Sequence, residues 1–150
     1  MSPKINYRGR VIIDGKTKGE ALVSRSGFNI LASLAKPSLK NLGGIRCLDQ
    51  GNPDLYGKKV SGKILCLPET IGSTGGGLIL QTVAKMNLAP RAMLFSGCID
   101  SLAAAGVILA RIWDHKPVIT IDQLGPEFLQ EVQTGQVISV YENGIIEIEL

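Results

Sequence analysis

The chain has 150 residues, of which 45% are hydrophobic and 19% are charged, and its net charge is +3. This length and composition are typical of one folded domain, so we expect a single domain over residues 1–150. Basic residues are scattered and aromatic residues make up only 5%, which argues against nucleic acid as a partner. The sequence shows no apolar run long enough to span a bilayer and no hydrophobic signal region. It therefore predicts a cytoplasmic protein with no membrane partner.

The first segment, from Ile5 to Arg25, is predicted to form a β hairpin. Val11–Ile13 and Ala21–Val23 are short apolar runs of the kind that form strands. They flank the dipeptide Asp14-Gly15, which is a strong turn signal.

The next segment, Ser26–Pro53, has little regular pattern apart from a short helix predicted over Phe28–Ala35. Long irregular segments inside compact domains are often functional. A surface connection without chemistry is an equal alternative, and the role of this segment stays open.

The most informative stretch runs from Val60 to Met86. It opens with Lys63–Leu67, an apolar run too short for a helix, which predicts a buried strand. It closes with apolar residues at the three- and four-residue spacing of a helical face: Leu78, Ile79, Leu80, Val83 and Met86. Between the two lies the glycine-rich loop Ile71–Gly77. The pattern predicts a strand–loop–helix unit.

This loop is the predicted binding site. Glycines let the backbone approach a ligand closely, and the free N–H groups of a helix start favour an anionic group. Ser73 or Thr74 is predicted at the N-cap position, with its hydroxyl at the mouth of the site. The loop lacks the lysine of a P-loop, the spacing of a dinucleotide-binding loop and the flanks of a nucleophile elbow. A capping serine with no chemistry is the competing interpretation.

The second half repeats the strand–helix pattern. The helix at Leu102 is predicted to be capped by Asp100 or Ser101, and a helix starting at Pro126 is predicted to end at Gly135. The predicted elements are a strand at Ala92–Phe95, a helix at Leu102–Trp113, a strand at Pro117–Ile121, a helix from Pro126 with Phe128, Leu129 and Val132 inside, and a hairpin of Val137–Val140 and Ile145–Ile148.

These elements predict an α/β fold with mixed sheets and flanking hairpins. Ligands in such folds bind at the carboxyl ends of the parallel strands. We therefore expect Ser73, the Ser96–Asp100 segment and Asp122 to surround one mouth.

A metal site within this chain is not predicted. Cys47, Cys66 and Cys98 are spaced too widely for a zinc or iron–sulfur signature, and His115 is the single histidine. Cys66 is expected to pack inside a strand, whereas Cys98 could line a site. Any metal must come from another chain.

Three stretches together resemble the small, or swivel, component of the aconitase X family: Gly57–Leu65, Ile71–Gly76, and Ala89–Ser96 leading into Ile99–Gly106. The resemblance implies a swivelling β/β/α domain like the mobile domain of aconitases. It also implies a large partner subunit that supplies the cysteines of an iron–sulfur cluster, whose iron would act as a Lewis acid. The small chain is expected to be inactive by itself.

The family contains hydro-lyases, including cis-3-hydroxy-L-proline dehydratase and mevalonate 5-phosphate dehydratase. The resemblance implies that Ser73 is the base that removes the substrate proton. A carboxylate or phosphate of the substrate is expected against the neighbouring residues Gly72, Thr74, Gly75 and Gly76. The archaeal phosphomevalonate type tends to carry a Phe-Trp-Gly-Gly-like stretch where this chain has Phe28–Ser33. This departure favours cis-3-hydroxy-L-proline as the substrate, with mevalonate 5-phosphate as the alternative.

Two other classes remain open at this stage. A swivelling phosphohistidine carrier would need a histidine in the central loop, which this chain lacks. A swivel domain that binds a small ligand without catalysis would need no large subunit, so an associated large subunit separates that possibility from the enzyme.

Overall fold

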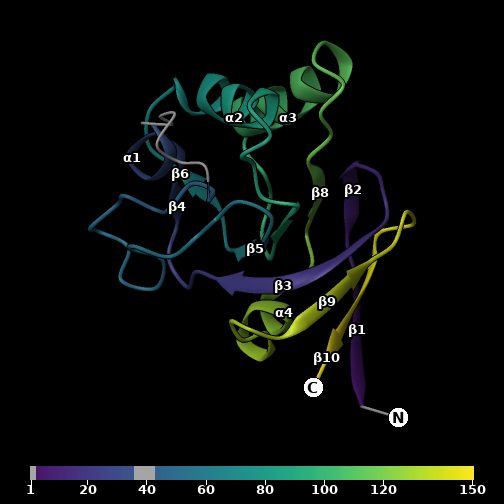
Figure 1. The fold of residues 1–150 in the computed structure, drawn as a ribbon. Helices are drawn as coiled ribbons and strands as arrows, with labels where there is room; N and C mark the ends of the chain where they lie inside the picture. The colour runs from purple at the N-terminus through teal and green to yellow at the C-terminus, as the bar shows by residue number, and fades with distance from the viewer. Residues whose placement is uncertain (1–2, 36–42) are drawn as a thin grey trace.

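A computed structural model describes residues 3–35 and 43–150 of the chain. The strands form a large mixed sheet and a small two-stranded one, and the larger helices lie on one side (Figure 1). The elements are β1 (Lys4–Arg8), β2 (Arg10–Ile13), β3 (Thr17–Val23), β4 (Phe28–Asn29), α1 (Ile30–Leu34), β5 (Ile64–Leu67), β6 (Thr70–Ile71), α2 (Gly76–Lys85), β7 (Ala92–Phe95), α3 (Ser101–Ile112), β8 (Ile119–Asp122), α4 (Pro126–Glu131), β9 (Val137–Val140) and β10 (Ile145–Glu149).

The large sheet bends at β3 into two layers. Its strand order is β1-β10-β9-β3-β5-β7-β8-β2. The first half of β3, Thr17–Glu20, pairs antiparallel with β9, whereas Ala21–Val23 pairs parallel with β5. The parallel strands β3, β5, β7 and β8 therefore form one layer, and the antiparallel strands at the chain ends form the other.

The parallel layer lies between the helices on one side and the antiparallel strands on the other, which makes three layers in all. Side chains of the parallel strands point to these two sides in turn. In β5, Ile64 and Cys66 face the antiparallel layer, while Leu65 and Leu67 face the helices. Residues on β7 alternate in the same way. Because side chains in a strand point to opposite faces in turn, a strand that is apolar at every position is covered on both sides. The predicted swivelling β/β/α fold is confirmed.

Helices α2 and α3 cover the outer face of the parallel layer. They cross so closely that a Cβ on Gly106 would lie 2.5 Å from the carbonyl oxygen of Gly77. Leu80 and Val83 of α2 are buried as predicted. Leu78 and Met86, predicted for the same inner face, are exposed. That prediction was wrong for these two residues, because the buried stripe of α2 faces only α1, α3 and the sheet.

The predicted hairpin over Ile5–Arg25 is wrong. Strand β2 pairs antiparallel with β8, and β3 lies four positions away from β2 in the sheet. Gly15 has φ of 158°, which is extended backbone and not the left-handed conformation that a two-residue hairpin turn needs. The chain therefore crosses from one layer to the other after Asp14 and does not fold back.

The predicted helix at Phe28–Ala35 is shorter than expected. Phe28 and Asn29 form strand β4, which pairs parallel with Thr70 and Ile71 of β6. Helix α1 then starts at Ile30, and the Asn29 side chain accepts a hydrogen bond from the Ala32 N–H at 3.0 Å. This small sheet joins the early segment to the glycine-rich loop.

The rest of the Ser26–Pro53 segment packs on the helix side of the sheet where it is described. Cys47 is fully buried there and shares a core with Leu55 and Val60 just beyond the segment. Residues 36–42 of this segment lie outside the described part of the chain. The described part therefore contributes buried residues to the core, including Phe28, Ile45 and Cys47.

The remaining predictions differ from the structure mainly at element ends. The strand predicted at Pro117–Ile121 is β8, which starts two residues later. Helix α4 starts at Pro126 as predicted but ends at Glu131, well before Gly135. Phe128 and Val132 are buried, whereas Leu129 is only partly buried. The closing hairpin of β9 and β10 is confirmed. In the described ranges, no helix combines the length and apolarity of a membrane span.

Candidate active site

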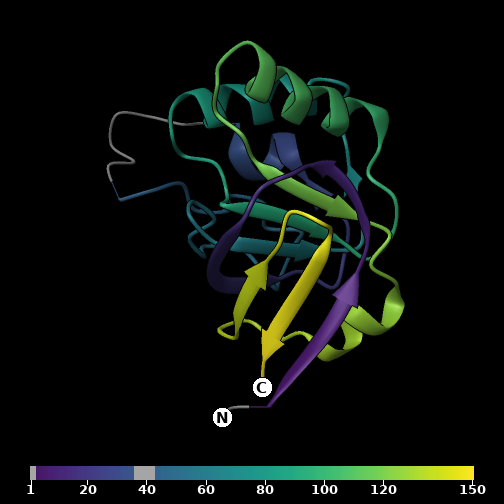
Figure 2. The same ribbon diagram turned by 90° about the vertical axis from the view of Figure 1, so that its right-hand side faces the viewer.

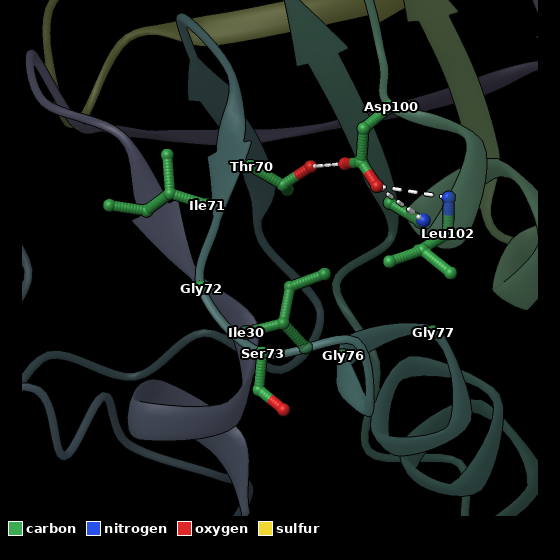
Figure 3. A pocket seen from close by; sticks show the side chains of 10 residues that line it. Ile30, Thr70, Ile71, Gly72, Ser73, Gly76, Gly77, Asp100 and Leu102 are labelled. Carbon is green, nitrogen blue, oxygen red and sulfur yellow. Dashed lines mark hydrogen bonds between the residues drawn. The ribbon is translucent and has the colours of Figure 1, made fainter.

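A hollow of about 190 Å³ lies where the N-termini of α2 and α3 meet the small sheet (Figure 3). It opens to the surface between α1, β6 and the glycine-rich loop. Its walls are Ile30, Thr70, Ile71, Gly72, Ser73, Gly76, Gly77, Asp100, Leu102 and Ala103. The hollow therefore combines a few polar groups with an apolar lining, as small-molecule sites commonly do.

Ser73 lies at the edge of this hollow with an exposed side chain. Its Oγ accepts a hydrogen bond from the Gly75 N–H at 3.1 Å. The N-cap of α2 is Gly75, which makes no side-chain capping bond. The prediction that Ser73 or Thr74 caps this helix is therefore wrong, because the N-cap lies one or two residues later than the sequence suggested.

Two residues of the first turn of α2, Gly76 and Gly77, line the hollow. The Gly76 N–H donates to the carbonyl of Ser73 at 3.1 Å. Among the described residues, the N–H groups of Gly77 and Leu78 have no backbone acceptor. Such groups carry the positive end of the helix dipole and favour an anion.

The predicted ligand residues are not equally placed. Gly72, Ser73 and Gly76 line the hollow, whereas Thr74 and Gly75 belong to the same loop but do not form its wall. Gly72 has φ of +103°, and a Cβ there would lie 2.6 Å from Asn29 Oδ1. A glycine is required at this position because any larger residue would be strained and would push the loop off the α1 cap.

Thr70 and Asp100 form the second polar group of the hollow. Their side chains are hydrogen-bonded, and Asp100 Oδ2 also accepts from the N–H groups of Leu102 and Ala103 at 3.0 Å each (Figure 3). Asp100 thus caps α3, as the sequence predicted. The sequence analysis did not predict Thr70 as a site residue, because the residues next to it in the sequence form no recognisable motif. The Ser73 hydroxyl points away from this pair in Figure 3, so Asp100 is not placed to activate it.

The sequence predicted that Ser73, Ser96–Asp100 and Asp122 surround one site, but the structure places them in three separate locations. Only Asp100 shares the hollow with Ser73. Ser96 lines a separate depression beside Arg25 and α4. Asp122 is fully buried, because it lies beneath the loop before α3 and not at its surface.

Asp122 nonetheless holds that loop in place. Its Oδ2 accepts from the Ile99 N–H at 2.9 Å, and its two carboxylate oxygens bind Arg10 at 2.9 and 2.7 Å. Ile99 directly precedes Asp100. The buried Asp122 carboxylate therefore fixes the backbone next to Asp100, which lines the hollow.

Replacing Asp122 by alanine is expected to lower the free energy of unfolding by about 3 kcal/mol, because the buried Ile99 N–H and the Arg10 guanidinium lose their acceptor. Urea unfolding measures this change. The matched variant Asp122→Asn keeps an acceptor for Ile99 and should lose less. Equal stability of the alanine variant and the wild type would show that the carboxylate does not hold the loop.

The cysteines do not converge on a metal site. Cys47 and Cys66 are buried and Cys98 is exposed, and burial raises the pKa of the Cys66 thiol. Within residues 3–35 and 43–150, no group of three or more His, Cys, Asp or Glu side chains could hold a metal ion. The three cysteines, all in the described part of the chain, therefore do not form a set of ligands for an iron–sulfur cluster. His115 is exposed and far along the chain from the glycine-rich loop.

Comparison with known proteins agrees with this fold. The family model of the aconitase X swivel domain matches residues 6–148. The chain belongs to the aconitase X family. The phosphomevalonate dehydratase small subunit of Thermococcus sibiricus is 31% identical over 97% of this chain and 99% of its own length. The protein of the same name from Methanosarcina mazei is 30% identical over 87% of this chain and 83% of its own.

The fold comparison gives the same family. A crystal structure of Thermococcus kodakaraensis aconitase X in its holo-form matches with a TM-score of 0.79 and 26% identity, covering 97% of this chain and 99% of that one. Within the family, this swivel domain corresponds to the small subunit of a dehydratase, because its full-length relatives are so named.

Proposed function

We propose that this swivel domain is the small subunit of a two-subunit dehydratase that acts on mevalonate 5-phosphate. The observation that carries the proposal is similarity over nearly the whole length to proteins named phosphomevalonate dehydratase small subunit. The departure at Phe28–Ser33 had favoured cis-3-hydroxy-L-proline. We prefer the phosphate substrate, because Phe28 and Asn29 serve a structural purpose as strand β4 and Asn29 also caps α1, so the departure says little about the substrate.

The geometry of the hollow supports binding of an anionic substrate. Its described walls contain no lysine or arginine. Attraction for a phosphate or carboxylate would come instead from the N–H groups at the start of α2, in the loop formed by Gly72, Thr74, Gly75 and Gly76. A ten-residue helix such as α2 provides a substantial dipole for this purpose.

We assign Ser73 as the base. Elimination of water needs a proton to be taken from the carbon beside the substrate carboxylate while the hydroxyl leaves from the next carbon. A serine hydroxyl is a weak base unless its deprotonated form is stabilised. The Gly75 N–H already donates to Ser73 Oγ, and the nearby helix start favours the same negative charge. These groups would lower the cost of forming the serine alkoxide.

The remaining machinery belongs to the large subunit in this proposal. We assign the iron–sulfur cluster to that subunit, since the cysteines described here do not meet. The hollow is open on one side, and Ser73 is exposed there. The isolated chain should therefore be inactive until a partner closes the hollow.

Anaerobic reconstitution with the large subunit tests the proposal. The complex should dehydrate mevalonate 5-phosphate with kcat/KM at least about a hundredfold above that for cis-3-hydroxy-L-proline, because a site built to bind a polar group strongly rejects a substrate that lacks it. The isolated chain is the control. Turnover of cis-3-hydroxy-L-proline alone would reject the assigned substrate but would still support a dehydratase small subunit. A complex that converts neither compound would reject both substrates, whereas failure to form a complex with the large subunit would support the non-catalytic binding domain.

A further inference from the structure

The outer side of helix α3 is apolar where a surface helix should be polar. Its exposed residues include four large hydrophobic side chains, which together we call the α3 face: Leu102, Ile108, Ile112 and Trp113. Ile112 is 60% exposed and Trp113 is 69% exposed. Figure 2 shows α3 lying along the outside of the molecule, above the sheet.

The residues between these four leave the surface free of charge. At 100° per residue, the sector that holds the α3 face also holds Ser101, Ala105 and Leu109, none of them charged. The opposite sector is already buried against α2 and the sheet. A helix that is hydrophobic all round is normally buried, so the α3 face has the character of a surface that contacts another protein.

The charged groups beside the α3 face are bound within the chain. Arg111 pairs with Asp14, and Asp114 accepts a hydrogen bond from Gln81 at 3.1 Å. Past the end of the helix, His115 and Lys116 are exposed. The surface is thus an apolar strip with one exposed cation, Lys116, past its end, which suits an apolar partner surface that has an acidic side chain beyond it.

We propose that the α3 face is a docking surface for the large subunit. Leu102 belongs both to the α3 face and to the wall of the Ser73 hollow. A partner that closes the hollow therefore touches the first residue of the strip. Leu78, a 67% exposed hydrophobic residue in the first turn of α2, directly follows Gly77, whose backbone lies against the Leu102 carbonyl.

This inference rests on the proposed function, because the occupant is the large subunit that the function requires. A stable heterodimer buries about 800 Å² on each partner. The α3 face is therefore the centre of a larger contact, in which large aromatic and aliphatic side chains account for most of the binding free energy.

The test measures binding of the purified large aconitase X subunit of the same organism, by calorimetry and without substrate. Ile112→Glu and Trp113→Ala should each weaken binding at least about thirtyfold. Leu150→Glu is the matched control, since Leu150 is 58% exposed and lies at the C-terminus, on the side of the molecule away from α3 (Figure 1). Circular dichroism should show the same fold and melting temperature for all variants.

Three results would overturn the inference in different ways. If all variants bind as well as the wild type, the docking surface lies elsewhere, while the proposed function stands. If the wild type does not bind the large subunit at all, the proposed function fails together with the inference. If the wild type self-associates in sedimentation experiments and Ile112→Glu is monomeric, the α3 face is an interface between two copies of this chain.

Discussion

Replacing Ser73 by alanine is expected to reduce kcat of the reconstituted complex about a thousandfold. General base catalysis typically contributes a factor of about 10² to 10⁴, and no second base in the hollow can take over. Asp100 is the other titratable group in its wall, but its carboxylate accepts from Thr70 and from the start of α3. Steady-state dehydration rates at saturating substrate measure the effect.

The same substitution should leave the protein intact in every other respect. Ser73 is exposed, and its one hydrogen bond joins neighbours in the same loop. The free energy of unfolding should therefore change by less than about 0.5 kcal/mol, and affinity for the large subunit should be unchanged. Thr82→Ala is the matched control, because Thr82 also bears an exposed hydroxyl and bonds only to its own helix at Leu78.

The two roles considered for Ser73 give opposite results. A base is indispensable for turnover but not for folding. A residue that only shapes the loop would change stability and KM while kcat stayed within a few-fold of the wild type. That second pattern would show that Ser73 shapes the loop and is not the base.

The parallel half of the sheet could be predicted from sequence because its signals are local. Ile64–Leu67 and Ala92–Phe95 are apolar at every position, which indicates burial on both faces, and each is followed by a helix. In this fold α2 and α3 cover one face of these parallel strands and the antiparallel layer covers the other. The capping role of Asp100 was also predictable, since an acidic residue just before an apolar helical run satisfies the first N–H groups.

The pairing of β2 could not be predicted in the same way. Asp14-Gly15 resembles a turn, but the partner of β2 is β8, more than a hundred residues later, and Arg10 lies opposite Asp122. That pairing is favoured by a bidentate contact to a buried carboxylate. A local turn signal carries no information about so distant a partner.

The sequence predicted the loop at which the hollow lies, but not all of the residues that line the hollow. The glycine-rich loop and the start of the next helix could be predicted, because glycine content and apolar spacing are local features of the sequence. Thr70 joins the site only through the small sheet, where Phe28 pairs with it. Leu78 and Met86 were assigned to the core because helical spacing shows which residues share a face and not how much of that face has a neighbour.

The second large effect is expected at the crossing of α2 and α3, where Gly106→Ala should lower the free energy of unfolding by roughly 3 kcal/mol. Alanine in a helix is ordinarily favoured over glycine by about 1 kcal/mol. Here the added Cβ would lie 2.5 Å from the Gly77 carbonyl oxygen and 3.0 Å from its Cα. Both are backbone atoms that cannot turn aside, so the clash outweighs the helix preference.

Thermal and urea unfolding measure this loss, and Gly43→Ala is the matched control because a Cβ at Gly43 meets nothing within 4 Å. An unchanged stability of Gly106→Ala would mean that the helices separate at no cost. The crossing also affects the shape of the hollow, since Gly77 of α2 and Leu102 of α3 both line it. Separating the two helix starts by about 1 Å should reduce kcat about a hundredfold in the folded fraction. Stability and activity then fall together in Gly106→Ala, whereas Ser73→Ala loses activity alone.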